Sequence, residues 1–132
     1  MDIPNDLKYT SDHQWVRTQP ANDDGSVTVT VGITAYATDA LGGVVYLDLP
    51  ELSASVEANK AVGEVESTKS VSDIYAPVTG TVTKVHTELV DELHLINAEP
   101  YGQGWMFEIE VTDVSQLDGL LDAAAYGELT GE

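Results

Sequence analysis

Hydrophobic and polar residues alternate along several short segments of the chain, most clearly in residues 26–33. Valine or isoleucine occupies every second position from Val27 to Ile33, with threonine or glycine between them. A period of two places successive side chains on opposite faces of a β-strand. Shorter extended runs cover residues 44–47, 61–67, 71–75, 81–86 and 105–111. The pattern therefore predicts a mainly β protein.

Two helices are expected among these strands. Residues 34–41 are good helix formers and are followed by Gly42 and Gly43, which is typical of a glycine helix end. Near the carboxyl end, Asp113 and Gln116 have the spacing of a capping pair. Hydrophobic residues then recur at helical spacing, at Val114, Leu117, Leu120, Leu121 and Ala124. This pattern predicts a carboxy-terminal helix with one side packed on the sheet.

A β-hairpin is predicted where residues 61–67 and 71–75 are joined by Thr68, Lys69 and Ser70. These connecting residues are polar, as a solvent-facing turn requires. The chain contains only five Lys and Arg residues against 23 Asp and Glu. A lysine at the tip of a hairpin is therefore conspicuous and easily reached.

Composition limits the possible functions. The chain has 132 residues with 42% apolar content, which predicts one compact domain over residues 1–132. The formal net charge of −18 argues against a nucleic-acid partner, because binding phosphates requires Lys and Arg. It is compatible with attraction to basic surfaces of partner proteins.

The absence of cysteine excludes disulfides, thiolate metal sites and a thiol nucleophile. Any sulfur redox chemistry must therefore come with a cofactor. No apolar run approaches the roughly 18 residues expected of a membrane span, and residues 1–6 do not resemble a leader. A cytoplasmic protein without a membrane partner is expected.

No catalytic or metal-binding set is recognisable. His13, His86 and His94 are far apart and outside any nucleophile motif, and EF-hand, HExxH, Walker and GxGxxG patterns are absent from the sequence. Aromatic residues on short strands favour core packing over a ligand surface. The residues in question are Tyr9, Trp15, Tyr101, Trp105 and Phe107. An acidic β module that presents a lysine fits a carrier better than an enzyme.

Several segments resemble the glycine cleavage system H-protein family of lipoyl carriers. The similar segments are LKYT and HQWV at residues 7–16, VGIT at 31–34, VVYLDLP at 44–50, VESTK through YAPV at 65–78, and PYGQGWM at 100–106. They follow one another in order, so the resemblance covers a core of about residues 5–125. It implies a barrel-sandwich hybrid of two small antiparallel sheets with a carboxy-terminal helix.

The resemblance also implies a function without catalysis of its own. A lipoyl group attached to Lys69 by lipoyl-attaching enzymes would carry an aminomethyl group from glycine decarboxylase (P protein) to aminomethyltransferase (T protein). Dihydrolipoamide dehydrogenase (L protein) would then reoxidise it, and the carrier would be a monomer. One alternative is a relay that donates lipoate to 2-oxoacid dehydrogenase complexes. A biotin carrier or unmodified module is disfavoured, because the residues beside Lys69 are not DKA or MKM.

Five residues are candidates for holding the arm or for recognition: Asp12, Gln14, Tyr36, Glu66 and Asp73. The family usually has Glu where this chain has Gln14, so Asp12 and Asp73 are predicted to supply the charge that holds a cationic amine. Glu66 and Asp73 flank Lys69 and are candidates for recognition by lipoyl-attaching enzymes. The alternative is that they form a solvated acidic strand.

Two further departures from the family pattern are visible. Gly43 stands where the family usually has an acidic residue, and Leu93-His94 replaces a Pro-Glu pair. His94 is predicted to lie in a surface loop.

Overall fold

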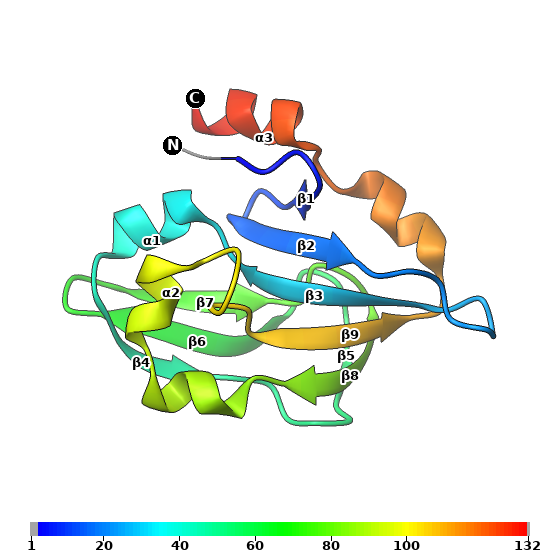
Figure 1. Cartoon of the computed structure of the whole chain (residues 1–132), viewed down its shortest axis with the longest axis horizontal. Helices are drawn as coiled ribbons and strands as arrows, with labels where there is room; N and C mark the ends of the chain where they lie inside the picture. Colours follow the sequence, from blue (N-terminus) through cyan, green and yellow to red (C-terminus); the bar gives the residue numbers. More distant parts are fainter. Residues whose placement is uncertain (1–2, 132) are drawn as a thin grey trace.

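The computed structural model describes residues 3–131, which form two antiparallel β-sheets with short helices around them (Figure 1). The larger sheet has the order β1 (Lys8–Tyr9), β2 (Gln14–Thr18), β3 (Val27–Ile33), β9 (Phe107–Val111), β8 (Gly80–Val85) and β5 (Ser55–Val56). The smaller sheet has the order β4 (Val44–Asp48), β6 (Ala61–Ser67) and β7 (Val71–Tyr75). The predicted mainly β fold with two antiparallel sheets is confirmed, and the sheets do not close into a barrel.

Strand β3 lies inside the larger sheet, between β2 and β9. Its Val29 is opposite Ile109 and its Val31 is opposite Phe107, and all four side chains are fully buried. Burying a side chain of this size contributes about 1.5–3 kcal/mol relative to exposure. The alternating valines of residues 27–33 therefore anchor the main hydrophobic core.

A second hydrophobic cluster lies beneath the carboxy-terminal helix. The rings of Tyr9 and Tyr126 stack with centroids 4.7 Å apart, and Trp15 is fully buried and donates a hydrogen bond to the Pro100 carbonyl oxygen at 2.8 Å. Core packing is thus confirmed for Tyr9, Trp15 and Phe107. The two remaining aromatic candidates, Tyr101 and Trp105, are only half-buried.

Helix α1 (Ala35–Leu41) follows β3 directly and confirms the first predicted helix. The Thr34 hydroxyl accepts a hydrogen bond from the Ala37 backbone N–H at 3.2 Å, which caps the first turn. The helix ends at Gly42, whose φ of 80° and ψ of −157° are accessible essentially only to glycine. This glycine brings the chain sharply into β4.

The predicted helix from Asp113 onward is wrong in its extent. A 3₁₀ helix, η2 (Val114–Gly119), ends at an extended Leu120, and a separate helix α3 (Ala123–Thr130) begins after Asp122. The break has a clear cause, because Leu121 exchanges two 2.8 Å backbone hydrogen bonds with Tyr9 and so cannot be helical. The helical spacing of the leucines is therefore not that of one continuous helix.

The proposed capping pair is also only half correct. The Asp113 side chain accepts a hydrogen bond from the Ser115 backbone N–H at 3.2 Å, as a cap should. The Gln116 side chain reaches back to Asp113 but donates to its carbonyl oxygen, at 3.1 Å, and it also accepts from the Thr79 N–H at 2.7 Å and donates to the Thr79 carbonyl oxygen. Gln116 thereby joins η2 to the turn before β8.

Two short helices were not predicted: η1 (Thr87–Asp91) and α2 (His94–Ala98). His94 is exposed as predicted, but it is the first residue of α2 and not part of a loop. Ile96 of α2 is fully buried, which fixes this short helix on the core. Across residues 3–131, none of the helices has the length and apolar character needed to cross a bilayer.

Candidate functional site

The β6–β7 hairpin projects from the left-hand end of the molecule, below α1 (Figure 1). The Ser67 hydroxyl accepts hydrogen bonds from the backbone N–H groups of Lys69 and Ser70, both at 3.1 Å. The Ser67 N–H in turn donates to the Ser70 carbonyl oxygen at 2.8 Å. Such side-chain contacts fix a tight turn. The turn exposes Lys69, in agreement with the predicted hairpin tip.

The Lys69 side chain lies over the end of α1. A Cβ atom built on Gly42 would be 3.1 Å from the lysine Cε and 3.7 Å from Nζ. A side chain at position 42 would therefore push the lysine away, apart from the backbone strain that it would bring. Gly42 both ends the helix and leaves space for Lys69.

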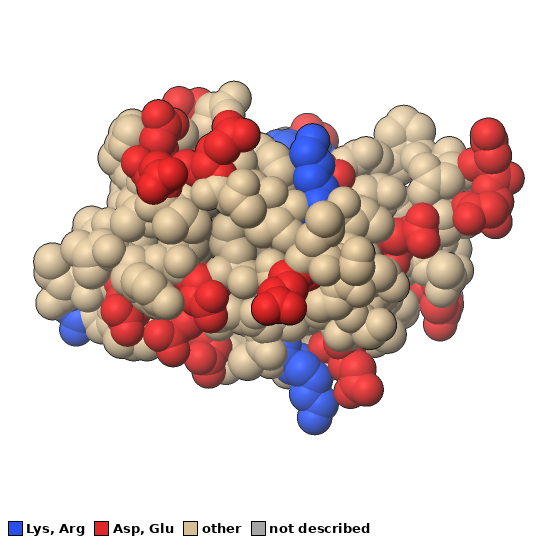
Figure 2. Space-filling view, turned by 90° about the horizontal axis from the view of Figure 1, so that it is seen from below, with Lys and Arg blue, Asp and Glu red and all other residues tan. Residues whose placement is uncertain are grey.

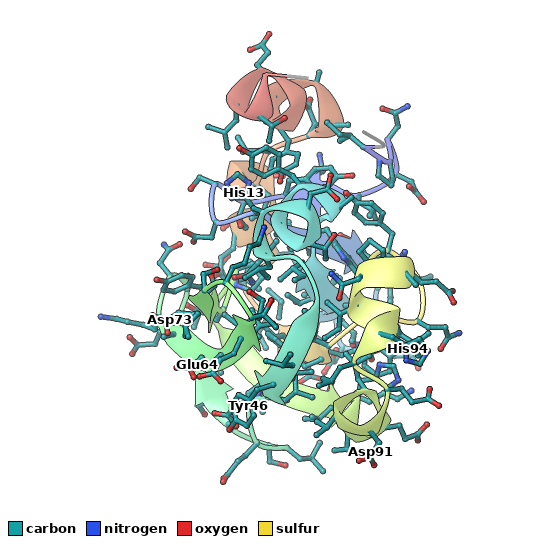
Figure 3. The ribbon with its side chains drawn as sticks, turned by 90° about the vertical axis from the view of Figure 1, so that its left-hand side faces the viewer. His13, Tyr46, Glu64, Asp73, Asp91 and His94 are labelled. Atoms are coloured by element: carbon teal, nitrogen blue, oxygen red, sulfur yellow. The ribbon has the colours of Figure 1, made fainter. Side chains whose placement is uncertain are left out.

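A pocket of about 210 Å³ lies between α1 and the hairpin. We call it the α1–β7 groove; its lining residues are Asp12, His13, Gln14, Ile33, Ala37, Ala40, Leu41, Val65 and Ser70 to Asp73. Figure 3 views this end of the molecule, with His13 and Asp73 on different elements. The fold thus brings three of the predicted arm-holding candidates, Asp12, Gln14 and Asp73, into one groove.

His13 contributes a neutral ring to the α1–β7 groove. Its Nδ1 is hydrogen-bonded to the Tyr126 hydroxyl at 2.9 Å, and its ring packs on Tyr36 with centroids 4.5 Å apart. Burial lowers the pKa of His13, and the Asp12 carboxylate opposes this only in part. The imidazole is therefore neutral at pH 7, and the groove's charge comes from its carboxylates.

Tyr126 supports His13 from α3. Burial raises the pKa of Tyr126 to about 12, although its hydrogen bond with Thr34 acts in the opposite direction. The hydroxyl is therefore protonated at neutral pH, and it lies 2.7 Å from the Thr34 hydroxyl. The candidate Tyr36 takes part in this network through its contact with the His13 ring, and its nearby hydroxyl also contributes to the raised pKa of Tyr126.

Gln14 is nearly fully buried, with 2% of its surface exposed. Its Nε2 donates to the Tyr75 carbonyl oxygen at 2.6 Å, and its Oε1 accepts from the Tyr75 N–H at 2.8 Å. The side-chain amide thus pairs with the free edge of β7 as a neighbouring strand would. A carboxylate could accept from this N–H but could not donate to the carbonyl oxygen, so the amide suits this position.

The smaller sheet carries a row of carboxylates close to the hairpin. Register places Asp48 opposite Glu64, and Glu64 opposite Asp73. Partial burial raises the pKa of Glu64, and the carboxylates of Glu66, Asp73 and Asp48 raise it further. Glu66 itself lies opposite Tyr46 and Val71 and does not line the α1–β7 groove. Figure 2 shows acidic side chains outnumbering basic ones on the face seen from below.

The remaining histidine contacts and acidic groups do not form a second candidate site in the part of the chain that the structure describes. His86 stacks on Trp105 and its Nδ1 lies 2.6 Å from the Trp105 carbonyl oxygen. Within residues 3–131, no three His, Asp or Glu side chains are grouped so that they could hold a metal ion.

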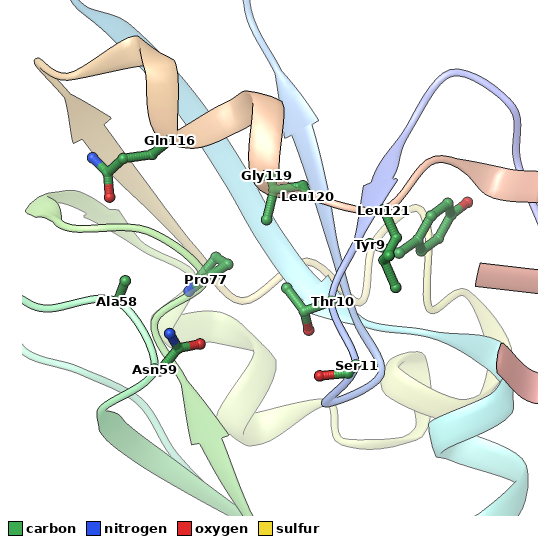
Figure 4. A pocket seen from close by; sticks show the side chains of 10 residues that line it. All are labelled: Tyr9, Thr10, Ser11, Ala58, Asn59, Pro77, Gln116, Gly119, Leu120 and Leu121. Atoms are coloured by element: carbon green, nitrogen blue, oxygen red, sulfur yellow. The ribbon is translucent and has the colours of Figure 1, made fainter. Parts of the chain in front are cut away.

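A separate pocket of about 380 Å³ contains no residue of the hairpin (Figure 4). It is lined by Tyr9, Thr10, Ser11, Ala58, Asn59, Pro77, Gln116, Gly119, Leu120 and Leu121. Lys69 and the α1–β7 groove therefore remain the candidate site.

Two antiparallel sheets with an exposed lysine at a hairpin turn are the arrangement expected of a carrier domain. The sequence model of the glycine cleavage H-protein family matches residues 7–132. The chain belongs to this family.

Individual relatives agree with this assignment. The glycine cleavage system H protein of Micrococcus luteus is 56% identical over 128 residues, covering 97% of each chain. That of Mycobacterium avium is 52% identical over 134 residues, covering 98% of each chain. The crystal structure of a glycine cleavage system H protein from Mycobacterium marinum matches with a TM-score of 0.87 and 42% identity, covering 98% of this chain and 100% of that chain.

The protein is therefore a lipoyl carrier of the glycine cleavage system, and its family carries a covalently attached lipoate. The names of these relatives do not favour the lipoyl-relay alternative. The surroundings of Lys69 fit such a group, because the lysine is exposed and Gly42 leaves room beside its amine. The chain also has no cysteine that could trap a dithiolane as a mixed disulfide.

Proposed function

We propose that Lys69 is the lipoyl attachment residue, and that the protein shuttles aminomethyl groups from glycine decarboxylase to aminomethyltransferase, with dihydrolipoamide dehydrogenase completing the cycle. The observation that carries this proposal is the exposed Lys69 at the β6–β7 turn, with its amine over Gly42. Acylation of Nζ replaces an ammonium with a neutral amide and makes the chain one unit more negative. Bound at this position, lipoate supplies a dithiolane that takes up the carried group.

Asp12 and Asp73 are proposed to hold the cationic amine of the carried group. Both line the α1–β7 groove and are exposed, and neither forms an ion pair with another residue in the range 3–131. Hydrogen bonds between a carboxylate and an ammonium are stronger than neutral ones. Gln14 is proposed to act indirectly, because its amide holds the end of β7 on which Asp73 lies.

The double variant Asp12→Asn, Asp73→Asn is expected to lose the carried group faster. Without acceptor enzyme, the loss of the aminomethyl group should be about tenfold faster, which corresponds to roughly 1.4 kcal/mol of lost holding energy. Formaldehyde and ammonia released over time measure this rate. The control variant Asp91→Asn, Asp118→Asn removes the same charge at exposed positions outside the groove. Equal lifetimes in the two variants would show that these carboxylates hold nothing.

The partner enzymes set further expectations. We propose that Glu66 and Asp73 contribute to recognition by lipoyl-attaching enzymes, supported by their places beside Lys69 on β6 and β7. We also propose that the protein itself catalyses no reaction. The organisation of residues 1–132 as one domain, a monomeric state and a cytoplasmic location stay predictions.

Intact mass of the protein tests the proposed attachment. After incubation with lipoate, ATP and a lipoate-protein ligase, we expect the mass increment of one lipoyl group, mapped to Lys69 by peptide analysis. Biotin would give a different increment, and an unmodified module would give none. The lipoylated protein should then support glycine decarboxylation with the purified partner enzymes. A lipoylated protein that is inactive there, with partners verified on another carrier, would contradict the shuttle function.

A further inference from the structure

Among the described residues that line the α1–β7 groove, His13 is the one whose side chain ordinarily titrates near neutral pH (Figure 3). Its backbone φ of 64° lies in the left-handed region, which residues other than glycine rarely adopt. The His13 N–H donates to the Thr10 carbonyl oxygen at 3.1 Å, and the His13 carbonyl oxygen accepts from the Thr34 N–H at 3.0 Å. Strained positions that the surrounding structure holds in this way cluster at functional sites.

The contacts of the His13 ring leave one of its two nitrogens without a partner. Nδ1 is bonded to the Tyr126 hydroxyl at 2.9 Å, and the Tyr36 ring packs on the imidazole. Nε2 makes no hydrogen bond to any residue in the range 3–131. The neighbouring Gln14 differs, because both polar atoms of its side chain are bonded to the backbone of Tyr75. Nε2 is therefore available to a group that occupies the groove.

The Tyr126 hydroxyl allows the neutral His13 ring to present Nε2 either as a donor or as an acceptor. This hydroxyl has one proton and lies between His13 Nδ1, at 2.9 Å, and Thr34 Oγ1, at 2.7 Å. If Tyr126 donates to Nδ1, the imidazole proton is on Nε2. If Tyr126 donates to Thr34, Nδ1 carries the proton and Nε2 has a free lone pair. A cationic amine in the groove favours the second arrangement.

We propose that His13 is a third binding residue for the carried aminomethyl group, with Nε2 accepting a hydrogen bond from the cationic amine while Nδ1 donates to Tyr126. This inference rests on the proposed shuttle function with the arm on Lys69. An ammonium group has three N–H donors. The carboxylates proposed to hold it, Asp12 and Asp73, line the same groove as His13. The neutral imidazole supplies one more acceptor, from the residue next to Asp12.

Such a hydrogen bond protects the carried group. The group is lost when the amine gives up a proton and the nitrogen lone pair displaces the sulfur from the carbon. The sulfur keeps the electron pair of the C–S bond and leaves as a thiol, and water supplies the oxygen of the formaldehyde that is released with ammonia. Each acceptor that stabilises the ammonium form therefore slows the loss.

The contact also makes the holding of the amine depend on pH. Burial lowers the pKa of His13, and the Asp12 carboxylate opposes this in part. The other titratable groups that contact the ring or share its groove are Tyr36 of α1, Tyr126 of α3 and Asp73 of β7. As the pH falls through the lowered pKa, the imidazole gains a proton, Nε2 becomes a donor, and the two cations repel each other. The carried group is therefore held less firmly in acid.

Two substitutions of His13 separate the roles of its nitrogens. The side-chain amide of His13→Asn reaches only the place of Nδ1, and asparagine tolerates the left-handed backbone. The longer amide of His13→Gln reaches the place of Nε2, accepts a hydrogen bond and does not titrate. At about pH 7.5, the loaded His13→Asn protein should release formaldehyde and ammonia about fivefold faster than the unsubstituted protein, and His13→Gln should stay within about twofold.

The pH profile separates a binding role of His13 from a structural one. The amine itself loses its proton more readily as the pH rises, so each release rate is divided by that of His13→Gln at the same pH. For the unsubstituted protein this ratio should be near one at about pH 7.5 and should rise to about threefold as the pH falls toward about 5. A ratio that stays constant over this range would overturn the inference.

His94→Asn is the matched control, because His94 is exposed and does not line the α1–β7 groove. It should release the group at the unsubstituted rate, and equal rates in His13→Asn and His94→Asn would contradict a role of His13.

Nuclear magnetic resonance of the ¹⁵N-labelled imidazole of His13 gives a readout that does not depend on release or on a variant. In the loaded protein the proton should be on Nδ1, and a proton on Nε2 would overturn the inference. Failure to find a lipoyl group on Lys69 by intact mass would overturn the proposed function as well. A lipoylated protein that shuttles normally, with a lifetime of the carried group that His13→Asn leaves unchanged, overturns this inference alone.

Discussion

Replacing Lys69 with arginine is expected to abolish lipoylation and, with it, glycine cleavage in a reconstituted system. The guanidinium keeps the positive charge at the hairpin tip but stays protonated and does not form the amide. Because Lys69 is exposed, the free energy of unfolding should change by no more than about 0.5 kcal/mol. Loss of function would then reflect loss of the attachment atom and not of the fold.

Intact mass and glycine decarboxylation with the partner enzymes measure this effect. Lys60→Arg is the matched control, because Lys60 is an exposed lysine that precedes the same strand, β6. It should be lipoylated and active like the unsubstituted protein. Normal activity of Lys69→Arg, or a lipoyl group found on Lys60 in that variant, would refute the assignment.

Replacing Gln14 with leucine is expected to lower the free energy of unfolding by roughly 2–4 kcal/mol. Leucine is similar in size to glutamine and apolar, which suits a site with only 2% exposure, but the N–H and carbonyl oxygen of Tyr75 both lose their partner. Each buried polar group left unpaired costs about 1–3 kcal/mol. The end of β7, with Asp73, should loosen as a result.

Urea unfolding followed by tryptophan fluorescence gives the magnitude. Gln103→Leu serves as control, since Gln103 is exposed and its side chain makes no hydrogen bond within residues 3–131. Faster hydrogen exchange of the β7 amides in Gln14→Leu would link the loss to this edge. A change below 0.5 kcal/mol would mean that water replaces the amide without penalty.

Local sequence patterns correctly predicted the strands and helices that bury one face. The alternation in residues 27–33 appears as β3, and the polar connection at 68–70 appears as the turn with Lys69. Helix α1 could also be predicted, because the glycine that ends it is a signal in the local sequence. These features depend on neighbours in sequence, so the sequence carries them directly.

Features that depend on distant residues were not visible. The leucines after Asp113 have helical spacing, yet Leu121 pairs with Tyr9, which lies far away in the sequence. Nothing near Gln14 indicates that its amide meets Tyr75. Helix α2 has only five residues and no side-chain cap, so it lacks a start signal.

The same applies to the site. Asp12 and Asp73 were chosen because they lie near Gln14 and Lys69 in the sequence, and only the fold places them in one groove. The contact between Lys69 and Gly42 also joins segments from different elements. Contacts between residues of different elements depend on how the strands are arranged in the sheets, which local periodicity does not reveal.

The two sheets have four outer strands, and each is unsuited to pairing with a second molecule. Leu121 bridges β1, and the Gln14 amide covers β7 at Tyr75. The strand β5 has two residues, and β4 has a register shift between Val44 and Tyr46. Exposed regular edges are the usual starting points of intermolecular β-sheet growth. Neither sheet therefore offers a long regular edge to a second molecule, and the protein is expected to stay free of aggregation through its sheets even at high concentration.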